Sequence, residues 1–235
     1  MSNRTLPRMT GLAIAAALIC FPASASQDRE VPTSEPRGFF ISLSGQQFGF
    51  QGDLDGRLTL WHFEKAFFIP RLTKDFGLGL GLGLRQKWGL WELNVVQAGH
   101  RAAWSGSESQ AGLTALEING WGFPWRNSVV QPYYLLGLCF TWLAVRDGAW
   151  MAGSVYDATY NGLGINVGAG LVLNLGRRLF VSGGVKYRFL GFYYVNGGGR
   201  GRDIQQLTVG YQGPAWDKWL RAPSLGLNFG LSLVL

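Results

Sequence analysis

Five charged residues in this chain occupy positions that favour a buried charge network. Each lies in a stretch where polar and apolar residues alternate, on the polar side of the alternation: Arg85, Glu92, Glu117, Lys186 and Arg188. An isolated buried charge is very costly, so charges that share an interior must pair with one another. The pattern therefore predicts an interior charge network, and its simplest role is a structural ion-pair plug.

Catalysis would most readily involve His62 or His100, the two histidines of the chain. His100 is predicted near the outer end of a strand, followed by Ser105, Ser107 and Glu108. A base beside a hydroxyl and an orienting acid can activate a nucleophile. The spacing lacks a close His-Ser pair, so we interpret His100 as a histidine at the rim of the predicted fold, and predict no catalytic residue.

Two other features have the composition of a binding site without its full pattern. His62, Glu64 and Asp53 could ligate a metal, but they lie in a connection without fixed geometry. The glycine-rich run from Gly197 to Asp203 lacks the Lys-Ser/Thr ending of a phosphate-binding loop and is interpreted as a flexible external loop. Cys139 has no nearby base in the sequence, which indicates an inert thiol. The sequence thus predicts no metal and no cofactor.

The segment from Tyr160 to Phe189 shows which elements must position these residues. From Leu163 to Leu175 every second residue is apolar, while the residues between them are mostly glycine and asparagine. A period of two is the strand period. After a turn at residues 176–178 the alternation resumes up to Phe189. An apolar face opposite a small polar face is typical of a transmembrane β-barrel.

The composition agrees with a barrel in a membrane. The chain has 35 glycines and only 15% charged residues. Beyond the first 25 residues, no run of about 18 apolar residues could form a helical span. A closed barrel is the other way to satisfy every backbone group in lipid.

Eight segments alternate as strands, which predicts an all-β, eight-stranded, antiparallel up-and-down barrel. They are residues 38–50, 75–86, 90–103, 110–123, 132–145, 160–175, 179–189 and 224–235. Leu58 to Pro70 is either an extra strand or an amphipathic piece over the barrel mouth. If that segment and Asp203 to Tyr211 also cross the membrane, the barrel has ten strands.

The connections divide into short turns at one end and longer external loops at the other. The loops are predicted at Gln51–Asp75, Trp104–Ser109, Arg146–Val155 and Val195–Pro223. Within the longest one, four residues are candidates for contact with a ligand or partner: Trp216, Trp219, Arg200 and Arg202. An aromatic girdle is predicted near the strand ends, formed by Trp88, Trp91, Trp104, Trp121, Trp125, Tyr133, Tyr134, Trp142, Tyr193 and Tyr194.

The N-terminus has the pattern of a secretory signal. Basic residues precede an apolar run, and Ala23-Ser24-Ala25 is a small-residue cleavage site. We predict a signal peptide at residues 1–25, a periplasmic tail at 26–36 and the barrel at 37–235. The formal net charge is +7, but the bases are scattered and do not indicate nucleic-acid binding.

Three parts of the chain resemble the small outer-membrane barrels of the OmpA-like and opacity-type superfamily. They are Pro132–Phe140, the hairpin Gly164–Phe189 and the last strand. That strand is similar to the C-terminal assembly signal of such barrels at Asn228, Gly230, Leu233 and Leu235, with Leu235 where an aromatic residue is usual.

The resemblance implies a monomer in the bacterial outer membrane, inserted by the assembly machinery and in contact with membrane lipid and lipopolysaccharide. It favours a non-enzymatic structural or surface-interaction role through the external loops. Two alternatives stay open: a narrow gated pore, in which interior salt bridges exchange partners, and a lipid A modifying enzyme.

Overall fold

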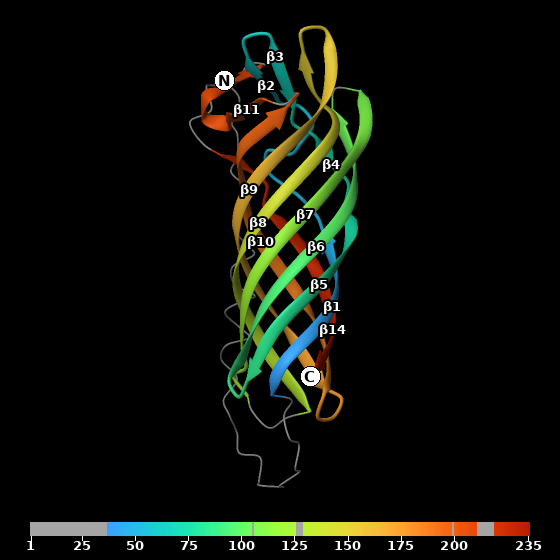
Figure 1. Cartoon of the computed structure of the whole chain (residues 1–235), viewed down its shortest axis with the longest axis vertical. Helices are drawn as coiled ribbons and strands as arrows, with labels where there is room; N and C mark the ends of the chain where they lie inside the picture. The colour runs from blue at the N-terminus through green and yellow to red at the C-terminus, as the bar shows by residue number, and fades with distance from the viewer. Residues whose placement is uncertain (1–36, 105, 126–128, 199, 211–218) are drawn as a thin grey trace, which may run out of the picture. The chain divides into compact units, whose positions relative to one another are not determined.

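The computed structural model describes residues 37–104, 106–125, 129–198, 200–210 and 219–235, and this part of the chain forms a closed antiparallel β-barrel (Figure 1). The strands of its ring are β1 (Gly38–Phe48), β5 (Asp75–Gln86), β6 (Gly89–Trp104), β7 (Ser107–Gly122), β8 (Val130–Met151), β9 (Ser154–Asn174), β10 (Leu179–Gly197) and β14 (Ser224–Val234). Neighbours in the chain pair with one another, and β1 pairs with both β5 and β14, which closes the ring. The predicted eight-stranded barrel is confirmed.

Strand β5 illustrates why this sequence forms a barrel wall. Leu78, Leu80 and Leu82 point outward and are exposed, whereas the glycines face the interior. At Gly79 a Cβ atom would collide with the hydroxyl of Ser44 on the neighbouring strand β1. Glycine therefore leaves room for polar side chains from adjacent strands inside a narrow barrel.

The ring is much taller on one side than on the other. Strands β1, β5 and β14 have 11, 12 and 11 residues, whereas β8, β9 and β10 have 22, 21 and 19. We call the end where β1 begins and β14 finishes the terminal end, and the opposite end the cap end (Figure 1). The tall strands extend beyond the others at the cap end.

Two predicted loops at the cap end are wrong. Instead of a loop from Arg146 to Val155, β8 and β9 continue as a hairpin with a turn at Ala152 and Gly153. The register shifts between Val145 and Ala149, so a bulge accommodates the polar residues that had indicated a loop. Similarly, β6 and β7 extend into the predicted loop from Trp104 to Ser109 and pair up to Trp104 and Ser107.

Short strands outside the ring cover the cap end. They are β2 (Thr59–His62), β3 (Lys65–Phe68), β4 (Arg71–Leu72), β11 (Arg200–Asp203), β12 (Thr208–Gly210) and β13 (Leu220–Arg221), with the 3-10 turn η1 (Ile204–Gln206). The hairpin β2–β3 pairs with β8, β12 pairs with β2, and β11 and β13 pair with β10. We call β2, β3, β11, η1 and β12 the cap; it contains both segments that would have made ten membrane strands.

Apolar side chains fill the two ends of the barrel interior. At the terminal end, Phe40, Trp121, Tyr133 and Phe180 belong to one buried cluster, and a larger cluster extends into the cap. The aromatic girdle was therefore partly mispredicted, because Trp104, Trp121 and Tyr133 are buried rather than exposed. Their strand parity is that of inward residues, which explains the difference.

The predicted signal peptide and periplasmic tail, residues 1–36, lie outside the described residues. Within the described part, no helix is long and apolar enough to be a candidate membrane span.

Candidate functional site: the polar interior

A network of ion pairs crosses the middle of the barrel. Glu117 on β7 accepts hydrogen bonds from two bases on β10, at 2.8 Å from Lys186 Nζ and 3.0 Å from Arg188 Nε. All three side chains are buried. Successive inward positions are two residues apart in a strand, so β10 can present both bases to one carboxylate.

Neutral amides complete this network. The side-chain oxygen of Gln46 on β1 accepts hydrogen bonds from both Lys186 and Arg188, and its Nε2 atom lies 3.4 Å from Glu117 Oε2. Asn119 donates to Glu117 at 3.4 Å. The Arg188 guanidinium also stacks over the ring of Phe48, at 4.3 Å from its centroid. These contacts compensate charges that would otherwise be very unfavourable in the interior.

Glu92 on β6 has a different environment. Its Oε1 atom accepts a hydrogen bond of 2.7 Å from the hydroxyl of Ser42, and among the described residues no basic group forms an ion pair with it. Nearby, Asn94 donates to Ser44 at 3.2 Å. Glu92 is thus buried against neutral hydroxyl and amide groups, unlike Glu117.

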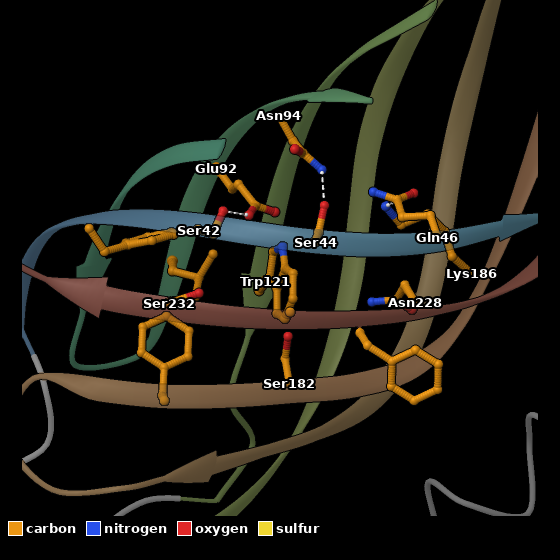
Figure 2. A pocket seen from close by; sticks show the side chains of 15 residues that line it. Ser42, Ser44, Gln46, Glu92, Asn94, Trp121, Ser182, Lys186, Asn228 and Ser232 are labelled. Atoms are coloured by element: carbon orange, nitrogen blue, oxygen red, sulfur yellow. Dashed lines mark hydrogen bonds between the residues drawn. The ribbon is translucent and has the colours of Figure 1, made fainter. Parts of the chain in front are cut away.

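A small polar cavity of about 20 Å³ lies beside Glu92 (Figure 2). Serines from β1, β10 and β14 line it together with Glu92, Asn94, Lys186 and Asn228. A cavity of this size can hold about one water molecule. The Oδ1 atom of Asn94 is buried without a hydrogen-bond partner, so it is available to accept a hydrogen bond from a water molecule in the cavity.

Arg85 belongs to a third cluster, at the terminal end. Its guanidinium lies over the ring of Phe180, 4.4 Å from the centroid, and 5.1 Å from that of Phe123. Its Nη2 atom donates to Gln131 at 2.8 Å and to Asn174 at 2.9 Å. The five predicted charges are therefore all buried, but only Glu117, Lys186 and Arg188 share one network. The neutral partners of these charges were not predicted from the sequence; they are Gln46, Asn119, Gln131 and Asn174. Their positions on the inward side of the strand alternation could have indicated them.

Between the ion pairs and the cap end, the barrel interior is largely apolar. Phe48, Leu143 and Phe192 of the ring pack with Leu60 and Phe67 of the cap in the larger buried cluster. The hydroxyl of Tyr160 donates to the backbone oxygen of Phe68 at 2.7 Å, which ties the ring to the cap. The insertions between the ring strands therefore fill the cap end of the interior.

The structure shows no contact between His100 and the described candidates for its catalytic partners, Ser107 and Glu108. His100 faces the interior, packs against Phe48 and Phe50, and its Nδ1 donates to the Thr73 carbonyl oxygen at 2.9 Å. Ser107 is exposed in the turn, and Ser105 lies outside the described residues. His100 lies near the cap end of β6, past the outward apolar residues of that strand, as predicted. Its side chain is buried in the interior rather than exposed at the rim, and this burial lowers its pKa.

Neither the candidate metal ligands nor Cys139 forms a binding site among the described residues. The ring of His62 packs on Phe63 at 4.6 Å, and the described residues contain no group of three or more potential metal ligands. Cys139 is a free, fully buried cysteine. The glycine-rich segment interpreted as a flexible loop instead contributes β11, which pairs with β10.

The loop-contact candidates are dispersed. Trp219 is exposed just before β13. Arg202 is half-buried in β11, and Arg200 lies in the same strand. Trp216 lies outside the described residues. No common contact surface can be assigned to all four.

The residues of the predicted assembly signal lie in and just after β14. Asn228 points inward and donates to the Tyr133 hydroxyl at 3.2 Å, whereas Leu233 and Leu235 are exposed. Gly230 pairs with Ser44 of β1 and Ser182 of β10. This strand pairs with β1 and with β10 and so closes the ring.

No family model and no curated protein matches this chain. Among solved structures, it is similar to the outer membrane protein OprG from Pseudomonas aeruginosa, with a TM-score of 0.53 and 14% identity over 86% of this chain and 99% of that one. The fold is that of a bacterial outer-membrane β-barrel. Membership of the OmpA-like and opacity-type superfamily is not shown.

Two further outer-membrane proteins also match. Surface protein A of Neisseria has a TM-score of 0.46 and 14% identity, covering 84% of this chain and 97% of the other. A major outer membrane protein from Thermus thermophilus has a TM-score of 0.43 and 9% identity, covering 82% and 99%.

Proposed function

We propose that this protein is a monomeric barrel of the bacterial outer membrane with a structural or surface-interaction role and no catalytic activity. The observation that carries this proposal is a continuous outward apolar band around a filled interior. In this role the barrel contributes to membrane integrity, and its cap contacts lipopolysaccharide, a host surface or a partner protein. The assembly machinery would recognise β14.

The apolar band involves every strand of the ring. Exposed members include Ile41, Leu43, Leu80, Leu82, Leu93, Val95, Ile118, Leu136, Leu138, Ile165, Leu171, Val185, Phe189, Leu227 and Leu231. Soluble monomers rarely expose a contiguous apolar patch of more than a few hundred Å². Outward charges appear toward the cap end, at Arg101, Arg146 and Arg221. This distribution supports insertion across a bilayer.

The interior supports a structural role rather than an open channel. The ion pairs occupy its middle, apolar side chains occupy its cap end, and the polar cavity measures only about 20 Å³. Eight strands enclose an interior that side chains can fill. The closed ring also leaves no free sheet edge in the membrane, which supports a monomer.

Exposed aromatic residues on the cap support surface contact. Phe63 projects from the tip of the β2–β3 hairpin with 90% of its side chain exposed, and Trp61 lies on the same hairpin. On the neighbouring hairpin, Val155 pairs with Trp150, and Val155 and Tyr156 are exposed. Such residues are well suited to a contact at an interface.

The test combines cell fractionation with refolding. We expect the mature protein in the outer-membrane fraction and a faster-migrating band on a denaturing gel before boiling. A soluble protein without this gel shift would overturn the proposal.

Two arginine substitutions test the depth of the band. Leu80→Arg places a charge in the middle of the band, whereas Gln97→Arg places it opposite Leu78, at the border toward the cap. In lipid vesicles we expect a loss of about 2–4 kcal/mol for Leu80→Arg and about 0–1 kcal/mol for Gln97→Arg. Equal effects would contradict the membrane placement.

One observation favours a gated pore as a second function: Glu92 and Lys186 line the same polar cavity while Lys186 is paired with Glu117. An exchange of partners could widen the interior. Planar-bilayer conductance tests this, because a gated pore predicts altered opening in Glu92→Ala and Glu117→Ala. Conductance unchanged in both variants would exclude such gating.

A lipid A modifying activity is the third alternative, and unaltered lipid A masses after overexpression would exclude it.

A further inference from the structure

An apolar groove lies on the outer surface of the barrel, where the middle parts of β8, β9 and β10 meet β13. It has a volume of about 760 Å³, within the size range of ligand sites. Leu138, Ile165 and Phe189 line it with exposed side chains, and Trp219 and Arg221 also contribute. The groove faces away from the polar interior and is a separate site.

The backbone around Gly191 creates one wall of this groove. Gly191 on β10 pairs with Arg221 on β13, and a Cβ atom at Gly191 would lie 2.9 Å from the ring of Trp219. The absence of a side chain thus lets the Trp219 ring lie against β10. Tyr193 packs beside that ring with centroids 5.4 Å apart. The Trp219 ring therefore bounds the groove, and Tyr193 packs against that ring.

Arg221 gives the groove a positive charge. The nearby Asp53 carboxylate accepts a hydrogen bond of 2.7 Å from the backbone N–H of Arg221, and no described acidic residue forms an ion pair with its guanidinium. The side chain is exposed. A guanidinium binds phosphate oxygens in a fork geometry, and aromatic rings favour the boundary between apolar and polar membrane regions.

We propose that this groove binds an acyl chain of a phosphorylated glycolipid of the outer leaflet, with Arg221 on the lipid phosphate. The inference rests on the proposed function, since it places the groove at the outer surface of the membrane. Apolar walls accept the chain, and Arg221 at their cap-side border matches the charge of the headgroup. The ligand is a lipid held at one side of the barrel, distinct from an even lipid shell.

The experiment uses the folded full-length barrel in detergent and a bis-phosphorylated lipid A with a photoreactive group on one acyl chain. We expect cross-links concentrated in the peptides that contain Ile165 and Phe189. Native mass spectrometry then measures lipid affinity. Arg221→Gln should weaken binding about fivefold, the size expected for an exposed charge contact. Arg101→Gln, an exposed arginine on β6, is the control and should leave affinity unchanged.

A second pair of variants tests the groove itself. Ile165→Trp fills the groove and should reduce cross-linking at least fivefold, whereas Leu82→Trp, an outward change on β5, should not. With a dephosphorylated lipid A, Arg221→Gln should have no effect. Cross-links spread evenly around the barrel, or equal effects of Arg221→Gln and Arg101→Gln, would overturn this inference. A normal gel shift and outer-membrane fractionation in the same preparations would leave the proposed function intact.

Discussion

The middle of the barrel interior and its cap end are stabilised by different interactions. In the middle, Glu117, Lys186 and Arg188 hold one another across the ring. At the cap end, side chains such as Phe67 of the cap pack with ring residues in an apolar cluster. The first set depends on charge balance and the second on burial, so the two regions should respond differently to substitution. Residues of the ring alone build the network, whereas the cap cluster needs insertions between ring strands.

The largest effect is expected for Glu117→Gln. This change leaves Lys186 and Arg188 buried without a counter-charge while keeping the size of the side chain. We expect the free energy of unfolding to fall by about 3–5 kcal/mol. Urea unfolding in lipid vesicles, followed by tryptophan fluorescence, measures it. A loss below about 1 kcal/mol would mean that the network does not depend on this carboxylate.

A somewhat smaller and more local effect is expected for Phe67→Ala. This side chain is fully buried in β3, so its truncation leaves a cavity between cap and ring and should cost about 3 kcal/mol. Limited proteolysis should then cleave the cap first, while the gel shift of the ring persists. Phe63→Ala, at the exposed tip of the same hairpin, is the control and should change stability by less than about 0.5 kcal/mol. Loss of the gel shift would show that the cap and the ring unfold together.

Glu92→Gln should have a much smaller effect than the same change at Glu117. Glu92 is bonded to the Ser42 hydroxyl, and the amide oxygen of glutamine can accept that hydrogen bond. No described base loses an ion partner, so we expect a change of about 1 kcal/mol or less in the same unfolding experiment. An effect equal to that of Glu117→Gln would place both carboxylates in one coupled network.

The comparison also shows what could be predicted from the sequence. The alternation in β5 predicted its bounds, Asp75 to Gln86, and inward parity is sufficient to place the five interior charges. The same alternation, applied to every residue of β7 and β8, would also have predicted that Trp121 and Tyr133 face the interior. It does not give the partner of each charge, because that depends on the stagger of strands across the barrel. Glu117 therefore meets Lys186 and Arg188, while Arg85 meets Gln131 and Asn174.

The cap was predicted least well, for a physical reason. Its strands have two to four residues, too few for a clear period of two, and they pair with distant segments such as β3 with β8 and β12 with β2. Such pairings depend on tertiary packing rather than on local pattern. Likewise, Asp147 and Gly148 indicate a turn by composition, but the chain accommodates them in a bulge.

The smallest expected effect is the contribution of His100, which lies near the apolar cluster of the cap end, to the pH dependence of stability. His100 packs against Phe48 and Phe50, and burial lowers its pKa from the ordinary value of 6.5. The unfolded chain therefore takes up a proton at His100 as the pH falls below 6.5, while the folded protein does not, so acid destabilises the fold. Unfolding between pH 7 and pH 5 should show a weaker pH dependence for His100→Gln than for the unmodified protein. Identical slopes would mean that His100 titrates alike in both states, and that the apolar packing around it does not exclude its charge.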